Sequence, residues 1–401
     1  MEKNTKPEIE AARFRQDIRS LLHTRVREAI EITLEEELAE ALGCGRYERS
    51  GERLGYRNGK QRRTITTAYG PKDLEIPRGR LVSEDGTSQE FRSQIVPRYQ
   101  RRSREVDEAI LGAYLAGANS RRIKKALSPL LGEKHLSKSA VSRVVSRLKE
   151  HFACWSERDL SEARYAIVYL DGFYIKVRLA RRVVSVPVLA VLGVAEDGRK
   201  VLVSLRLAVS EAGVHWRAVI EDLKARGLSA PRVIVSDGHK GLTKACEAWP
   251  EAEVQRCTWH KWENLKMHCP VHAHAELKRD WDAIVRADDG LAARAAYRAF
   301  MTKWMKLVPA VAHSLEESGL DLLTFYSFPK SMWKSLRTTN ALENLNREFR
   351  RRTKTQGSFA TEAAGVTLLW GLVAFGQIHL RRIDGYRDMD NLLRDPAQEA
   401  A

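Results

Sequence analysis

Hydrophobic residues in the middle of the chain occur in short runs that are typical of buried strands, and two of these runs end on an aspartate. Residues 166–170 lead directly to Asp171, and residues 233–236 lead directly to Asp237. The runs that predict strands cover 166–170, 175–179, 183–194, 201–207, 233–236 and 254–256, and helical spacing covers 212–226 and 239–248. Packing does not require a charge at the end of a buried strand. Two such aspartates therefore predict a shared site.

With 166–170 and 175–179 counted together, the order of these elements is three strands, helix, strand, helix, strand. This is the order of an α/β ribonuclease-H-like core, whose mixed sheet with flanking helices has carboxylates at the ends of its first and fourth strands. Patterns outside the core are mainly helical. Residues 8–43 and 261–335 have helical spacing, and a last apolar helix is expected at about 360–381.

Three short helices are predicted between residues 103 and 152, at about 103–115, at 120–131, and from Ser137 as an N-cap. Apolar residues give the third helix a buried face, and small and basic residues form its outer face. The outer residues that we consider candidates for DNA contact are Lys138, Ser139, Ser142, Arg143 and Arg147. This pattern resembles a helix-turn-helix with a reader of the major groove, although a plain three-helix bundle has the same pattern.

The charge of the chain favours a polyanion as partner. The formal net charge is +16 and the sequence pI is about 9.7, and residues 45–104 contain fifteen Lys and Arg against seven Asp and Glu. A small hairpin is expected here, with strands at 62–68 and 73–76, and a loop-rich linker is the alternative. The basic residues that we expect to contact DNA are Arg62, Arg63, Arg101 and Arg102 here, and Arg350, Arg351, Arg352 and Lys354 near the C-terminus. For the second group the alternative is a solvated basic helix end.

Cysteine usage and hydropathy predict a reduced, cytoplasmic protein without a membrane partner. The five cysteines are an odd number and are widely scattered. The first residues contain no apolar segment typical of a signal peptide, and no stretch reaches the roughly 18 apolar residues of a membrane helix.

Asp171, Asp237 and Glu343 are the residues whose side chains are best suited to catalysis. Hard oxygen ligands of this kind suit Mg²⁺ or Mn²⁺, and two such ions can activate an oxygen nucleophile and stabilise a leaving oxygen. Each residue also has an ordinary interpretation. The aspartates could begin turns, and Asn340 with Glu343 could form a capping box, with Arg347 paired one turn later.

Cysteine and histidine residues cluster after the last predicted strand. Cys257 and His260 are spaced Cys-x-x-His, and His268, Cys269, His272 and His274 follow. Two Cys-x-x-His pairs could form a tetrahedral zinc site, but residues 261–267 look helical and would hold the pairs apart. The preferred interpretation is a core cysteine at 257 and a histidine at 260 beside the acidic site.

With these residues in view, the chain resembles the mutator-type transposases of bacterial insertion sequences, a family with an Asp-Asp-Glu triad. The resemblance covers most of the chain. The motifs that carry it are Tyr56-Arg-Asn-Gly59, Pro97-Arg-Tyr-Gln-Arg-Arg-Ser103, Asp171-Gly, Ser236-Asp-Gly238, Cys257-x-x-His260, Thr339-Asn-x-x-Glu-Asn-x-Asn346 and Arg352-Thr-Lys354. The resemblance implies that Asp171, Asp237 and Glu343 bind two Mg²⁺ or Mn²⁺ ions as the catalytic triad, with Cys257, His260, Asn340 and Asn346 as accessory residues.

The resulting expectation is a DNA transposase that binds terminal inverted repeats and target DNA as double strands, and that cleaves and joins them as a homodimer or higher oligomer. The alternatives are a metal-dependent nuclease or resolvase without joining activity, and a non-catalytic helix-turn-helix regulator. An α-rich DNA-binding N-terminal region would precede the catalytic core. The predicted segments are a helical segment at 1–44, a basic DNA-contact region at 45–104, a helix-turn-helix domain at 105–153, the first part of the core at 160–260, an all-helical insertion at 261–335, the second part of the core at 336–385 and a polar tail at 386–401.

Overall fold

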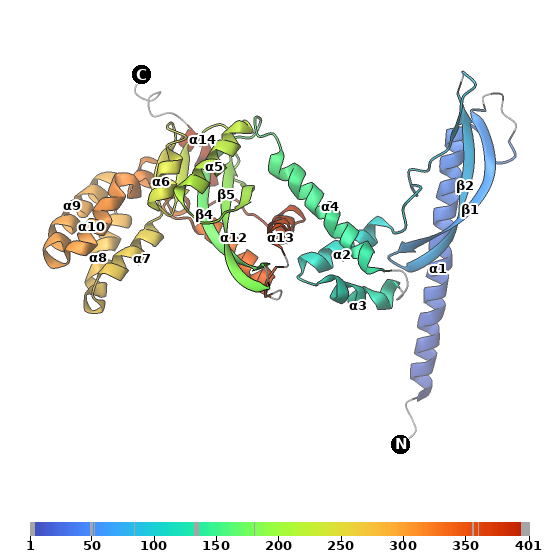
Figure 1. Cartoon of the computed structure of the whole chain (residues 1–401), viewed down its shortest axis with the longest axis horizontal. Coiled ribbons are helices and arrows are strands. Elements are labelled where there is room, and N and C mark those ends of the chain that lie inside the picture. The colour runs from blue at the N-terminus through green and yellow to red at the C-terminus, as the bar shows by residue number, and fades with distance from the viewer. Residues whose placement is uncertain are drawn as a thin grey trace. The chain divides into compact units, whose positions relative to one another are not determined.

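The chain divides between Ser146 and Arg147 into two units, which are treated separately below. The structure is a computed structural model, and it describes residues 5–48, 51, 53–83, 85–131, 136–179, 181–354, 357–359 and 361–393 (Figure 1). No helix in this described part is both long and apolar enough to cross a membrane.

A long helix packed on a three-stranded antiparallel sheet forms most of the first unit (Figure 1). The helix is α1 (Thr5–Leu42), and the strands are β1 (Gly55–Thr67), β2 (Gly70–Val82) and β3 (Ser88–Glu90). Leu34 of α1 packs with Ile65, Leu74 and Ile76 of the sheet. The predicted hairpin is therefore confirmed and the linker alternative is wrong. The strands are much longer than predicted, so the N-terminal region is less α-rich than we expected.

The three helices expected next are present at the predicted positions. They are α2 (Arg104–Leu115), α3 (Ser120–Leu131) and α4 (Lys138–Glu157), and the α4 residues up to Ser146 belong to the first unit. Val106, Ile110, Ile123 and Val141 belong to one buried cluster. The hydroxyl of Ser137 accepts a hydrogen bond from the N–H of Ala140 at 3.1 Å, as expected of an N-cap.

The second unit contains a five-stranded mixed sheet with the order β6-β5-β4-β7-β8. Three antiparallel strands come first in the chain: β4 (Tyr165–Leu179), β5 (Arg182–Ala195) and β6 (Lys200–Leu207). The short strands β7 (Val233–Ser236) and β8 (Glu253–Arg256) add to the other side of β4 in parallel. The mixed sheet predicted from the apolar runs is thus confirmed.

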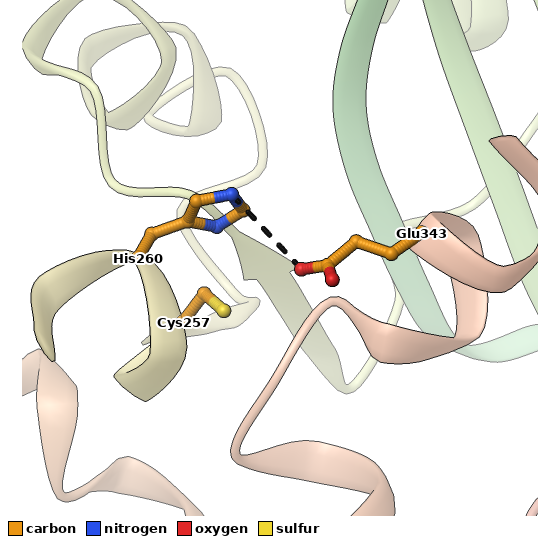
Figure 2. A group of neighbouring side chains, drawn as sticks. All are labelled: Cys257, His260 and Glu343. Atoms are coloured by element: carbon orange, nitrogen blue, oxygen red, sulfur yellow. Dashed lines mark ion pairs between the residues drawn. The ribbon is translucent and has the colours of Figure 1, made fainter. Parts of the chain in front are cut away.

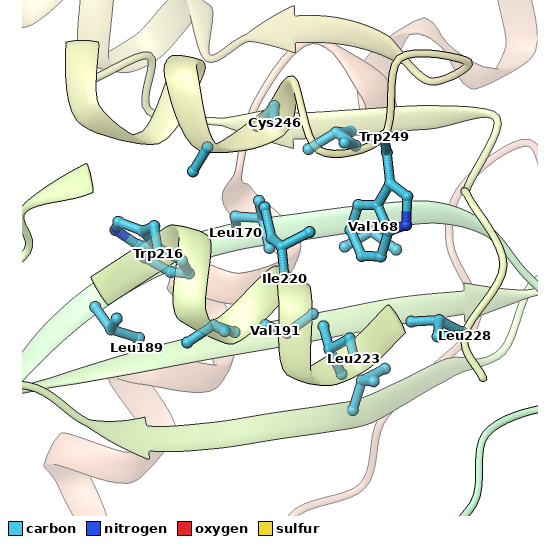
Figure 3. Close-up of a cluster of buried hydrophobic side chains, with 14 of the residues drawn as sticks. Val168, Leu170, Leu189, Val191, Trp216, Ile220, Leu223, Leu228, Cys246 and Trp249 are labelled. Carbon is cyan, nitrogen blue, oxygen red and sulfur yellow. The ribbon is translucent and has the colours of Figure 1, made fainter. Parts of the chain in front are cut away.

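Helices cover both faces of this sheet. On one face, α5 (Gly213–Ala225) and α6 (Lys240–Cys246) bury a cluster that includes Val168, Leu170, Trp216 and Ile220 (Figure 3). Successive side chains of a strand point to opposite faces, so Tyr169, Asp171 and Phe173 belong to the other face. There the ring of Phe173 lies 5.6 Å from that of Phe349 in α12 (Asn340–Thr353). The apolar helix α13 (Glu362–Ala374) and the short α14 (Met389–Leu393) follow α12.

The described residues between β8 and α12 form helices, as their pattern predicts. These are α7 (Thr258–His268), α8 (His274–Val285), α9 (Gly290–Leu307), α10 (Pro309–Ser318) and α11 (Trp333–Leu336), with short 3₁₀ turns between them. They enclose a hydrophobic cluster of their own, around Trp281, Phe300 and Trp304.

Candidate active site

Asp171 and Asp237 occupy equivalent positions on neighbouring strands. The parallel pairing of β4 with β7 ends at Leu170 and Ser236, and each aspartate is the residue that directly follows this last pair in the chain. Ser236 also pairs with Arg256 of β8, and Cys257 is the next residue there. Asp171, Asp237 and Cys257 therefore form one row across three strands.

The prediction that Asp171 ends its strand is wrong. β4 continues to Leu179, and Asp171 pairs with Ala190 of β5 within a continuous antiparallel ladder. The strand that ends next to Asp171 is β7. There the chain turns away from the sheet, and the N–H of His239 donates to Asp237 Oδ1 at 2.9 Å. The apolar run before Asp171 therefore marks where the parallel ladder stops.

Burial dominates the electrostatics of Asp171. The residue is only 8% exposed, and this burial raises the pKa of its carboxyl to about 7. The neighbouring carboxylates of Asp237 and Glu343 raise this pKa further, whereas His260 lowers it. The side-chain amide of Asn346 donates to Asp171 Oδ2 at 3.0 Å. Asp171 is thus a buried acid close to other acids.

Helix α12 carries Glu343 in its first turn and Asn346 one turn later. Its N-cap is Thr339, whose hydroxyl donates to Glu343 Oε1 at 2.9 Å. A capping box with Asn340 as the cap is therefore wrong, because Asn340 is already the first helical residue. Asn340 is exposed, and among the described residues it has no hydrogen bond to the carboxylates. Arg347 donates to Asn344.

Cys257 and His260 lie beside Glu343, and potential ligand atoms of the three residues are within 4.8 Å of one another (Figure 2). Cys257 is buried at the N-cap of α7 and accepts a hydrogen bond from the N–H of Thr339 at 3.4 Å. His260 Nε2 is 4.0 Å from Glu343 Oε1. The neighbouring Cys257, followed by the charges of Asp171 and Glu343, raises the pKa of His260 to about 9, although burial acts in the opposite direction. These neighbours favour the protonated form of His260.

The zinc alternative does not fit the structure. Cys257 precedes α7 and Cys269 follows it. A helix of this length separates its ends by about 16 Å at about 1.5 Å per residue, whereas a tetrahedral site needs its sulfur ligands about 2.3 Å from one ion. His274 Nε2 instead lies 3.0 Å from the carbonyl oxygen of Cys269.

Sequence analysis missed a fourth acid, Glu211, in the loop between β6 and α5. It lies against Gly172 and is among the carboxylates that raise the pKa of Asp171. No apolar run or motif marks Glu211, because it reaches the site through contacts between loops.

The predicted DNA contacts of the first unit differ in their availability. Arg63 donates to the carbonyl oxygens of Pro97 and Gln100, and Arg102 is mostly buried against Asp107. The side chains of these two arginines therefore form contacts within their own unit. Arg62 pairs with Glu75 but is 87% exposed. The residues Arg101, Ser139, Ser142 and Arg143 are also exposed. The side chain of Lys138 lies outside the described residues.

The predicted contacts of the second unit show a similar division. Arg147 is exposed. Arg350 on α12 and Lys354, the residue that follows this helix, are exposed and line a pocket of about 340 Å³ beside β4. Arg351 pairs with Glu348 at 2.6 Å, and Arg352 donates to the carbonyl oxygen of Gln377.

Comparison of the sequence with known proteins finds transposases. The sequence model of the family described as "Transposase, Mutator family" matches residues 2–377. The transposase for insertion sequence element ISRM5 of Rhizobium meliloti (strain 1021) is 33% identical over 368 residues, which cover 92% of this chain and 90% of that protein. The transposase for IS406 of Burkholderia multivorans is 34% identical and covers 88% of both chains. Among solved structures, a Drosophila P element transposase strand transfer complex aligns over 67% of this chain and 91% of that one with 10% identity and a TM-score of 0.38, a similarity too low to support a conclusion.

Proposed function

The chain belongs to the mutator family of transposases, and we propose that Asp171, Asp237 and Glu343 hold the divalent ions with which it cuts and joins DNA. The observation that carries this proposal is the row of Asp171 and Asp237 at the end of the parallel ladder, with Glu343 facing it from α12. Three carboxylates in a partly buried site repel one another. Divalent cations would offset that repulsion.

The residues fit Mg²⁺ or Mn²⁺ better than a softer metal. Carboxylate oxygens are the ligands that these two ions prefer. Asn346 is 4% exposed, and its side-chain oxygen is a buried acceptor without a described hydrogen bond. A zinc-like ion at Cys257, His260 and Glu343 would need a neutral imidazole, whereas the pKa of His260 is about 9. We therefore assign two ions, Mg²⁺ or Mn²⁺, to the carboxylates.

When bound, such ions would activate the attacking oxygen and stabilise the leaving oxygen of a phosphodiester. The protein's own residues prepare the site. Asn346 orients Asp171 through its amide, and Thr339 orients Glu343 through its hydroxyl. His260, as an imidazolium, would contact a phosphate oxygen. Arg350 and Lys354 would hold the DNA backbone beside the site.

The arrangement of the elements supports a finer assignment of the fold. The strand order β6-β5-β4-β7-β8, with the last two strands parallel to β4, supports a ribonuclease-H-like core at 160–260 and 336–385. We propose that the helices at 261–335 are an insertion domain, and that α2, α3 and α4 form a helix-turn-helix that binds the terminal inverted repeats with the basic sheet region at 45–104. Two DNA ends must be held together, so we propose at least a homodimer.

The test uses the purified full chain, Mg²⁺ and labelled DNA that carries the sequences flanking its gene. We expect covalent joints between end and target, and expect Asp171→Asn, Asp237→Asn and Glu343→Gln to abolish them while DNA binding remains. Glu348→Gln on the same helix is the matched control, since Glu348 pairs only with Arg351 in the described structure. Cleavage without joints would favour a nuclease. Joining that persists in Glu343→Gln would refute the assignment.

A further inference from the structure

Arg256, the last residue of β8, is a buried cation that contacts two separate segments of the second unit. The residue is only 7% exposed. Its Nη2 donates a hydrogen bond to the carbonyl oxygen of Gly238, the residue that follows Asp237. Its Nη1 donates to the carbonyl oxygen of Glu317 in α10 at 3.0 Å. One planar guanidinium therefore links the turn after Asp237 to the end of a helix that lies elsewhere in the chain.

The guanidinium packs directly on the backbone of this turn. Gly238 has a φ of +77°, which favours glycine, and a Cβ atom added there would be 2.0 Å from Arg256 Nε and 2.8 Å from its Cζ. The turn is thus held at two points, by the N–H of His239 on the Asp237 carboxylate and by Arg256 on the next carbonyl. Arg256 Nε is buried and has no acceptor among the described residues, so the two carbonyl oxygens fix the orientation of the group.

The other segment that Arg256 contacts is the C-terminal turn of α10, which ends at Ser318. Carbonyl oxygens in the last turn of a helix lack intrahelical partners, and the helix dipole favours a cation there. Lys261 of α7 also binds this helix end, since its Nζ donates to the carbonyl oxygen of Ser314 at 2.6 Å and the residue is 3% exposed. In the described structure Lys261 forms no hydrogen bond with the turn after Asp237, whereas Arg256 does.

We propose that Arg256 is a positioning residue for the reaction, which fixes the turn after Asp237 against the end of α10 and so holds the Asp237 carboxylate in place. This inference rests on the proposed function, because it assumes that Asp237 holds a divalent ion. Through this contact α10, which carries none of the proposed ligands, supports the site. A lysine at position 256 would keep the charge, but a single ammonium does not span two carbonyl oxygens as the two terminal nitrogens of a guanidinium do.

The test compares Arg256→Lys with the matched control Lys261→Met in the full chain. Both variants disturb the end of α10, but Arg256→Lys also frees the turn after Asp237. We expect Arg256→Lys to weaken Mn²⁺ binding to the DNA-free protein, measured by electron paramagnetic resonance, and to slow joining at saturating DNA, each by about 10- to 100-fold. Its affinity for DNA should stay unchanged. Lys261→Met should lower the melting temperature and keep both Mn²⁺ affinity and joining rate when assayed below that temperature.

Normal Mn²⁺ affinity and joining in Arg256→Lys would overturn this inference. Equal losses in Arg256→Lys and Lys261→Met would also overturn it, because both would then reflect only the anchoring of α10. If Asp237→Asn keeps Mn²⁺ binding and joining, the proposed function itself is wrong.

A second variant tests the same contact if Arg256→Lys does not fold. Gly238→Ala keeps the arginine but places a methyl group against its guanidinium. We expect it to weaken Mn²⁺ binding as Arg256→Lys does, and a Gly238→Ala protein with normal Mn²⁺ affinity would overturn the inference.

Discussion

Replacing Asp171 by asparagine should stabilise the metal-free protein. The carboxyl of Asp171 has a pKa of about 7 in the folded protein, mainly because it is buried, against 3.8 for an ordinary aspartate. One pKa unit corresponds to about 1.4 kcal/mol. Where the carboxyl is ionised in both the folded and the unfolded state, the difference therefore lowers the free energy of unfolding by on the order of 4 kcal/mol. Asparagine avoids the charge, and its amide can still accept the hydrogen bond that Asn346 donates.

The pH range of the effect follows from the two pKa values. Below about pH 4 the carboxyl is protonated in both states, so Asp171→Asn changes stability little. Between about pH 4 and 7 the unfolded chain releases the proton and the folded protein keeps it, so the stability of the wild type falls. Above pH 7 the carboxyl of the folded protein ionises as well, and the difference in stability between the variant and the wild type becomes constant. The extra stability of Asp171→Asn should therefore be largest near pH 8.

The assay is urea unfolding in the presence of a chelator, followed by tryptophan fluorescence. All nine tryptophans lie in the second unit, so the signal reports the unit that contains Asp171. Addition of Mg²⁺ should stabilise the wild type and leave the variant nearly unchanged, because a ligand stabilises only the state that binds it. Equal stability of the two proteins at pH 8, or a gap that does not grow between pH 4 and 8, would refute the reasoning.

Further predictions concern four single side chains. Arg350→Ala should weaken DNA binding and reduce the salt dependence of log K by about 1, whereas Arg63→Ala should lower the melting temperature, because Arg63 donates to two backbone carbonyls of its own unit. Thr339→Val should slow joining by about tenfold, or about 1.4 kcal/mol of barrier, and Thr339→Ser should not, since it keeps the hydroxyl for Glu343; equal rates for the two variants would contradict this. Ile220→Ala should lower the free energy of unfolding by about 2–5 kcal/mol in the urea assay, because Ile220 is fully buried in the cluster of Figure 3.

Much of the second unit could be predicted because its strands are nearly continuous apolar runs. Residues 166–170 and 233–236 are buried on both faces, and their short length and their aliphatic residues branched at Cβ favour strands over helices. The hairpin of the first unit was harder to delimit. Residues 55–63 are rich in Arg, Lys and Gly and mostly exposed, so the sequence showed only the part of β1 that meets α1 around Ile65.

Charge counting could not distinguish arginines that bind DNA from those that support the fold. Arg62, Arg63 and Arg102 belong to the same basic region, yet Arg62 is 87% exposed and Arg102 only 11%. The difference depends on which acids and carbonyls the tertiary fold brings near each side chain. Glu211 was missed for a similar reason, since the contact of Gly213 with Gly241 that places its loop has no signature in either loop alone.

Unequal strand lengths account for the position of the candidate site. β7 and β8 stop at Ser236 and Arg256, which pair with each other, and β7 leaves β4 at Leu170. β4 and β5 continue beyond this step, so Asp171 stays within a paired, buried strand while the chain turns away at Asp237 and Cys257. A carboxylate placed there is accessible along the open edge of β4 but is poorly solvated. This combination raises the pKa of Asp171.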